Sequence, residues 1–150
     1  MEERINYDEV FGISKKWLDE LFPFHVVIDE WGGVISFGPL LQKAINDIDI
    51  DEAIDNVFEY ELPEGEEGDV DITVENIKEK VMTRVNLIGK MAPLKLRGEV
   101  RYYSESKTCL FLLRPFITQT NQLKRYGIKL EDLPLSDPSI KYLELLEKNS

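Results

Sequence analysis

Residues 24–29 form a predicted strand that has apolar side chains on both of its faces. One face carries Phe24, Val26 and Ile28, and the other carries His25, Val27 and Asp29. A strand with one face open to water alternates apolar and polar residues, so both faces of this strand need a cover. The candidates for covering the second face are the helix that precedes the strand and a second copy of the chain.

The segment before this strand has apolar residues at helical spacing. Asn6 and Ser14 are typical N-cap residues, so we expect one short helix after Asn6 and another from Ser14 to residue 21. Gly12 weakens the connection between them, and Pro23 ends the helical run. The predicted apolar stripe of this amphipathic segment comprises Val10, Ser14, Trp17 and Leu21, with Phe11 and Leu18 beside it.

The rest of the pattern predicts an α+β fold with a five-stranded antiparallel sheet and flanking helices. Further strands are expected at 34–37, 85–90, 94–103 and 108–113, and helices at 39–46, 51–60, 74–82 and from 137 onward. The strand at 94–103 alternates apolar and charged residues, which indicates a half-buried strand toward the edge of the sheet. The strand at 108–113 is apolar on both faces, so we expect it to lie beside residues 24–29 at the sheet centre.

Composition and charge narrow the class of protein. The chain has 150 residues, enough for one domain, and no apolar run approaches the length of a membrane span. Residues 1–70 carry 19 acidic and 4 basic side chains, whereas residues 71–150 carry 10 acidic and 14 basic. The net charge of −11 argues against binding to nucleic acid or to an anionic membrane. Because the first residues do not resemble a signal peptide, we expect a cytoplasmic location.

Few residues could carry out chemistry. His25 is the single histidine, and a lone imidazole on a strand is expected to form structural hydrogen bonds rather than to ligate haem or act as a base. Cys109 is the single cysteine and lies in an apolar run, which is typical of a buried thiol. The chain has no Gly-rich phosphate loop, CxxC, HExxH or GxSxG motif. We therefore expect a domain that is not an enzyme, with no catalytic residue and no cofactor.

One acidic stretch partly resembles a calcium-binding loop. Asp47, Asp49 and Asp51 have the spacing of its first ligands. Glu52 stands where such a loop needs Gly, and Phe58 stands where it needs Glu. We expect a solvated acidic segment and no metal site.

Four groups of residues, in the same order along the chain, resemble the domain that accompanies the haem nitric-oxide-binding domain in soluble guanylate cyclases. They are Ile13-Ser14 with Phe22-Pro23-Phe24-His25 and Phe37-Gly38; Leu96-Arg97-Gly98-Glu99-Val100; Cys109-Leu110-Phe111-Leu112 followed by Pro115; and Gly127-Ile128-Lys129-Leu130-Glu131-Asp132-Leu133-Pro134-Leu135. The resemblance covers about residues 13–148. The family is called HNOBA or H-NOXA, and it also occurs in bacterial signal-transduction histidine kinases.

The resemblance implies a PAS-like fold, a five-stranded antiparallel sheet whose first and last strands are adjacent at the centre. It implies three parts. Residues 1–22 would be an N-terminal helical segment that packs on the sheet or on a partner, residues 23–136 the PAS-like domain, and residues 137–150 the start of a signalling helix.

The resemblance also implies a function in dimerisation and signal relay. The domain would couple a haem NO/O2 sensor domain to an output domain, in a bacterial histidine kinase or, alternatively, in a guanylate cyclase. Its expected partner is a second copy, giving a homodimer, or a paralogous H-NOXA domain, with the haem NO-binding domain as a neighbour.

The residue pattern suggests where two copies would meet. We expect a symmetric interface between the helical stripe and the second face of strand 24–29. The candidate interface residues are Phe11, Trp17, Leu18, Leu21, His25 and Val27. One alternative is that Trp17 and Leu18 pack on the sheet of their own chain. Another is a PAS domain that senses a small molecule, held between the sheet and the helices of residues 39–60, although the apolar side chains there are typical of a core.

Overall fold

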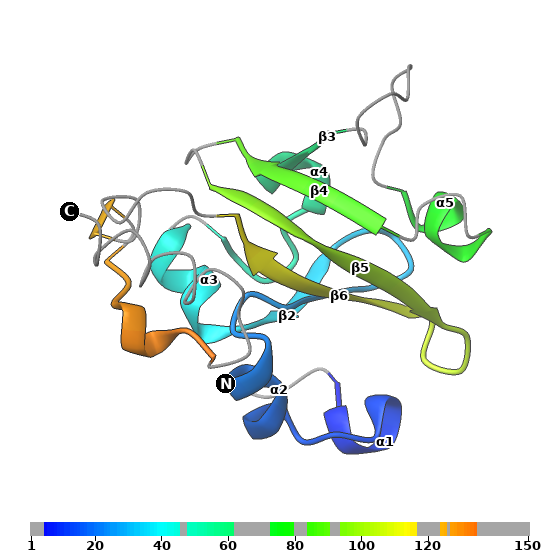
Figure 1. Cartoon of the computed structure of the whole chain (residues 1–150). Helices are drawn as coiled ribbons and strands as arrows, with labels where there is room; N and C mark the ends of the chain where they lie inside the picture. The colour runs from blue at the N-terminus through cyan, green and yellow to red at the C-terminus, as the bar shows by residue number, and fades with distance from the viewer. Residues whose placement is uncertain are drawn as a thin grey trace.

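The computed structural model describes residues 5–45, 48–61, 73–79, 84–90, 94–116, 124–125 and 127–134. One antiparallel sheet of six strands, in the order β2-β1-β6-β5-β4-β3, forms its centre (Figure 1). The strands are β1 (Val26–Ile28), β2 (Val34–Phe37), β3 (Phe58–Glu61), β4 (Arg84–Gly89), β5 (Lys95–Tyr103) and β6 (Thr108–Pro115). The helices are α1 (Tyr7–Phe11), α2 (Lys15–Leu21), α3 (Pro39–Ala44), α4 (Ile54–Val57), α5 (Val74–Lys78) and the 3-10 turn η1 (Leu130–Asp132).

The predicted α+β class is confirmed, but the sheet has a sixth strand that the sequence analysis missed. A helix was predicted over residues 51–60, where the structure has the four-residue helix α4 followed by β3. Phe58 is buried and Tyr60 packs against the core, while Glu59 and Glu61 are exposed. This alternation fits a strand paired with β4 and does not fit a continuing helix.

The two strands that are apolar on both faces lie side by side. β1 pairs with β6 in the middle of the sheet, with Val26 opposite Phe111, as predicted. The prediction that residues 94–103 lie toward an edge is wrong, because β5 pairs with both β6 and β4. Leu96 and Val100 are buried while Arg97 is exposed, so the alternation of β5 reports an uncovered face and not an edge position.

The main core lies against one face of the sheet. It contains Val26 and Ile28 from β1 and Phe111 from β6, together with buried side chains from the helices α3, α4 and α5. Figure 1 shows α3 on one side of the sheet and the pair α1–α2 on the other. The helices α1 and α2 therefore lie against the sheet face opposite the main core (Figure 1).

Two glycines permit close approaches between segments that resemble HNOBA domains. A Cβ atom on Gly38 would lie 2.2 Å from the Pro23 carbonyl oxygen and 3.0 Å from His25 Nδ1. A Cβ atom on Gly98 would lie 1.9 Å from the carbonyl oxygen of Leu112, on the adjacent strand β6. The distances of 2.2 Å and 1.9 Å to carbonyl oxygens are shorter than real Cβ contacts, so a side chain at Gly38 or Gly98 would force the backbone apart.

The fourth HNOBA-like segment also contributes to the core. Ile128 and Leu133, on either side of η1, are 3 % and 4 % exposed and join the main core cluster. The helix predicted from Asp137 onward lies outside the described residues. Among the residues that are described, no helix is long and apolar enough to cross a bilayer.

Candidate functional site

The helices α1 and α2 are set by local capping signals. The Asn6 side chain accepts a hydrogen bond from Glu9 N (3.3 Å), and Ser14 Oγ accepts one from Trp17 N (3.2 Å). Gly12 ends α1 with a positive φ of 71°. The predicted caps are confirmed, and they produce two short helices with a turn between them and not one continuous helix.

Together these helices cover the second face of the central strands. Ile5, Tyr7 and Leu18 form a second buried cluster with Val27 of β1 and Leu110 of β6. Val27 is fully buried and Leu110 is 4 % exposed. The cover that the apolar pattern of β1 requires is therefore supplied within one chain, by the leading helices.

A buried hydrogen-bonded network joins the helices to the strands beneath them. Tyr7 Oη lies 3.0 Å from His25 Nε2 and also hydrogen-bonds with Ser36 Oγ of β2. His25 Nδ1 lies 2.9 Å from the carbonyl oxygen of Phe22. A carbonyl oxygen can only accept, so Nδ1 carries the hydrogen and Nε2 of the neutral ring is an acceptor. The one hydroxyl hydrogen of Tyr7 therefore has two acceptors within reach, Ser36 Oγ and His25 Nε2. This geometry bears out the hydrogen-bonding role that was expected for His25.

The environment of His25 favours its neutral form. Burial lowers the pKa of the imidazole from 6.5 to about 4, although the hydrogen bond to Phe22 and the charge of Asp19 act in the opposite direction. Asp19 Oδ1 lies 3.7 Å from His25 Nδ1, and Asp19 Oδ2 accepts a hydrogen bond from Lys15 Nζ at 2.8 Å. Lys15 thus holds the carboxylate and also disfavours a second cation nearby.

The six predicted interface residues fall into three groups in the structure. Leu18, His25 and Val27 are at most 3 % exposed, beneath the helices of their own chain. Phe11 is half-buried, and its ring packs edge-on against that of Tyr103 at a centroid distance of 4.8 Å. The remaining two residues, Trp17 and Leu21 of α2, are exposed.

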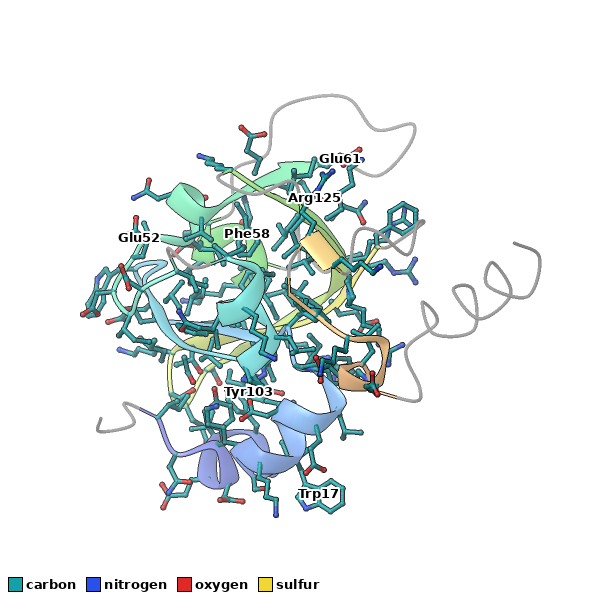
Figure 2. The ribbon with its side chains drawn as sticks, turned by 90° about the vertical axis from the view of Figure 1, so that its left-hand side faces the viewer. Trp17, Glu52, Phe58, Glu61, Tyr103 and Arg125 are labelled. Carbon is teal, nitrogen blue, oxygen red and sulfur yellow. The ribbon has the colours of Figure 1, made fainter. Side chains whose placement is uncertain are left out.

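The orientation of α2 differs from the predicted stripe. Trp17 is 60 % exposed and Leu21 is 42 % exposed, and Figure 2 shows Trp17 projecting away from the molecule. Leu18 makes the contact with the sheet instead. The left-handed turn at Gly12 restarts the helix, so the apolar stripe of α1 does not continue in register into α2. Trp17 and Leu21, four residues apart, form an exposed apolar pair on one side of α2.

Tyr7 and Ser36 complete the site, and neither was among the residues predicted from the sequence. Tyr7 is 2 % exposed and lies in the first turn of α1, where its hydroxyl reaches His25, just before β1, and Ser36 of β2. The available signal was the single histidine, because a buried imidazole requires a partner for each ring nitrogen. Which hydroxyl supplies that partner depends on the tertiary packing of α1.

The region proposed to hold a small molecule is packed as core. Its six apolar side chains are at most 6 % exposed and belong to one cluster, which contains Leu40, Leu41, Ile45, Ile54, Val57 and Phe58. Cys109 is fully buried, and burial raises the pKa of its thiol to about 12, so the thiol stays protonated. Within the described ranges, no group of three His, Cys, Asp or Glu side chains is placed to hold a metal ion.

The described residues define an α+β domain in which the outer helix α2 presents an exposed apolar pair, Trp17 and Leu21. The chain belongs to the HNOBA (heme NO binding associated) family, whose model matches residues 66–143. The resemblance that the sequence motifs indicated is thereby confirmed.

Two curated relatives are soluble guanylate cyclases of Caenorhabditis elegans. The chain is 24 % identical to gcy-32 over an alignment 166 residues long, which covers 87 % of the chain and 24 % of that protein. It is 33 % identical to gcy-34 over 64 residues, which cover 43 % of the chain and 9 % of that protein. The chain therefore spans about a quarter of the length of gcy-32.

Proposed function

We propose that this chain is a non-catalytic dimerisation and signal-relay module with a PAS-like fold, within a larger signalling protein. The observation that carries the proposal is the exposed pair Trp17 and Leu21 on α2, a helix anchored to the sheet by Leu18. Membership of the HNOBA family supports the proposal. The chain matches only 24 % of gcy-32 and 9 % of gcy-34, as expected for one domain of a larger protein.

The strand order supports the PAS-like part of the proposal. Without β3, the sheet has the order β2-β1-β6-β5-β4, in which the first and last strands are central neighbours. In this interpretation β3 is an added edge strand, and its pairing with β4 extends the sheet without changing the order of the other five.

The exposed side of α2 is suited to contact with a second copy or with a paralogous domain. Large apolar side chains such as Trp are enriched among the residues that dominate binding energy at interfaces. In a two-fold symmetric dimer, Trp17 and Leu21 would meet the same surface of the partner. Phe11 would lie at the margin of this contact, while Leu18, His25 and Val27 would support it from below.

The buried network explains how the same site could relay a signal. Tyr7 of α1 bonds to His25, the residue before β1, and to Ser36 of the edge strand β2, so a displacement of the helices would be transmitted to the sheet. In the proposal the sensor is a neighbouring haem NO-binding domain. The output domain is that of a histidine kinase or a guanylate cyclase, and the two relatives favour the cyclase.

The test of dimerisation is sedimentation equilibrium of the chain and of Trp17→Glu. We expect a dimer at micromolar concentration, and a dissociation constant raised by about 30-fold or more in the variant, the effect of a side chain worth about 2 kcal/mol. The matched control is Trp31→Glu, because Trp31 is 83 % exposed on the β1–β2 turn.

Two results would contradict the proposed dimer. One is a chain that stays monomeric at 100-fold higher concentration than the expected dissociation constant. The other is an equal effect of Trp17→Glu and Trp31→Glu, which would show that α2 has no special part in association.

A further inference from the structure

The helices α1 and α2 cover only part of the outer sheet face. Beyond β6, the outward positions of β5 carry Lys95, Arg97, Glu99 and Arg101, and all four are exposed. We call the open face the outward residues of β3 to β6 in the described structure that lie beyond the helices α1 and α2, with Leu112 at its margin, packed against the cluster under those helices. It comprises Glu59, Glu61, Arg84, Asn86, Ile88, Lys95, Arg97, Glu99, Arg101, Leu112 and Arg114.

Positive charge is concentrated along the middle of the open face. Arg97 and Arg114 are direct register partners on β5 and β6. Like charges directly opposite one another destabilise a sheet, and among the described residues neither arginine forms an ion pair. Arg101 forms an ion pair with Glu99 on the same face, with 3.8 Å between Arg101 Nη2 and Glu99 Oε2. The outward carboxylates of Glu59 and Glu61 lie on β3, beyond β4.

Aromatic rings hold the two central arginines in place. The Arg97 guanidinium lies 3.7 Å from the ring centroid of Phe116, and that of Arg114 lies 5.1 Å from the ring of Phe22. Phe116 is itself 38 % exposed. Stacked guanidinium groups lose little conformational entropy when a ligand binds, and their donors match the two oxygens of a carboxylate.

A small recess adjoins the stack of Arg97 on Phe116. Its volume is about 60 Å³. Lys95 and Arg97 bring two cations to its wall, and Glu61 brings one carboxylate; Asn86, Leu87, Leu96 and Phe116 complete the lining. The recess is therefore a place where one acidic side chain of a ligand would meet more positive than negative charge.

We propose that the open face is a docking surface for an acidic protein segment, independent of the dimer contact on α2. The carboxylates of such a segment would neutralise the positive charges of Arg97 and Arg114, which lie opposite one another on β5 and β6. Arginine and aromatic residues are enriched at the centres of protein interfaces, and Ile88, Leu112 and Phe116 add apolar area. An extended polyanion, such as a nucleic acid or an anionic lipid surface, would also face the acidic remainder of the chain, whose net charge is −11, whereas a short acidic segment would contact the open face alone.

The experiment uses two synthetic peptides as probes: Gly-Glu-Phe-Glu-Glu-Leu-Glu-Gly and the same peptide with every Glu replaced by Gln. Binding to the chain is followed by fluorescence anisotropy in about 0.1 M salt, where long-range charge effects are screened beyond about 10 Å. We expect the Glu peptide to bind at least tenfold more tightly than the Gln peptide. Backbone amide shifts in NMR spectra should map to β4, β5 and β6 and not to α1 and α2.

The variant pair Arg97→Glu/Arg114→Glu tests the site directly. We expect at least a tenfold loss of Glu-peptide binding. The control pair Lys16→Glu/Lys129→Glu makes the same change in net charge at two exposed lysines outside the open face, and should alter binding less than twofold. Thermal unfolding of both variants verifies that each is folded.

Three outcomes of the peptide experiments would overturn the proposal. They are equal binding of the two peptides, equal loss in the two variant pairs, and no binding of the Glu peptide at millimolar concentration. If Arg97→Glu/Arg114→Glu instead dissociates the dimer of the chain itself, the occupant is a second copy and the proposed separate partner is wrong. The Trp17→Glu variant should bind the Glu peptide normally, so this proposal and the dimer proposal fail separately.

Discussion

A single buried imidazole couples the protonation of one residue to the stability of the fold. His25 is neutral because burial outweighs the favourable effects of Phe22 and Asp19 on the charged form. The ring nevertheless uses both nitrogens, one toward the turn before β1 and one toward α1. A charged ring would need Nε2 to donate, which reverses the hydrogen bond with Tyr7.

Acid should therefore destabilise the chain through His25. The pKa of His25 is about 4 in the folded chain and 6.5 for an ordinary imidazole, so the unfolded chain binds the extra proton between these pH values. The contribution to the unfolding free energy is fully present above pH 6.5 and falls on acidification, by about 3 kcal/mol at pH 4. Urea unfolding at pH 7.5, 5.5 and 4.5 measures this loss.

The control for the pH experiment is His25→Asn. The Asn side chain keeps a donor near the Phe22 carbonyl oxygen but has no proton to gain in this range. All other titratable groups are common to the two proteins, so the difference between the two curves isolates His25. Parallel curves for the two proteins would show that the imidazole does not control the acid response.

At the scale of elements, the fold depends on how two short helices are attached to a sheet. Helices of five and seven residues are not stable alone, so α1 and α2 rely on tertiary contacts. The Tyr7 hydroxyl makes the polar part of that attachment, and its ring packs edge-on against Phe11 and His25.

Removing the Tyr7 hydroxyl should loosen α1 without emptying its site. Tyr7→Phe keeps the ring but leaves His25 Nε2 without that donor, at a cost of about 1–3 kcal/mol in unfolding free energy. Amide hydrogen exchange should accelerate in α1 and α2 more than in β5. The matched variant Tyr103→Phe removes a hydroxyl from a ring that packs on Phe11, and should cost less than 1 kcal/mol. Equal effects of the two variants would contradict the attachment described for Tyr7.

Much of this arrangement could be predicted from local sequence, and the errors have physical causes. The caps at Asn6 and Ser14 act within one turn, so they were visible in the sequence. The position of β5 inside the sheet was not visible in the sequence. Its alternating pattern shows only that one face is exposed, and that face is exposed because α1 and α2 do not cover this part of the sheet. Which α2 side chain meets the sheet was not visible either: Leu18 packs there and Trp17 is exposed, because the turn at Gly12 resets the helical phase.

The segment around residue 58 shows why β3 could not be predicted from the sequence. Ile54 and Val57 fit a helix, while Phe58 and Tyr60 fit a strand, and the two patterns overlap in a window too short to separate them by period. The partner strand β4 decides the outcome, and its contribution is tertiary.

For the whole molecule, charge is the dominant feature. The net charge of −11 produces self-repulsion that favours the unfolded chain, while the cations of the open face are a local exception.

Salt should therefore stabilise the chain. Raising the ionic strength from 0.01 M to 0.1 M shortens the screening length from about 30 Å to about 10 Å, and we expect the unfolding free energy to rise by roughly 1 kcal/mol. Urea midpoints at the two ionic strengths measure this. Arg97→Glu/Arg114→Glu adds negative charge and should steepen the dependence. A midpoint that falls with salt would mean that attractive ion pairs outweigh the repulsion.

The pairing of β1 with β6 has a mechanical consequence. The strands are antiparallel, so the chain enters β1 and leaves β6 at the same end of the sheet, where the Arg114 guanidinium lies over the ring of Phe22. A pulling force applied between the preceding and following segments would load the backbone hydrogen bonds one at a time, beginning beside Val26 and Phe111. The central pair would unzip under low tension instead of resisting in shear.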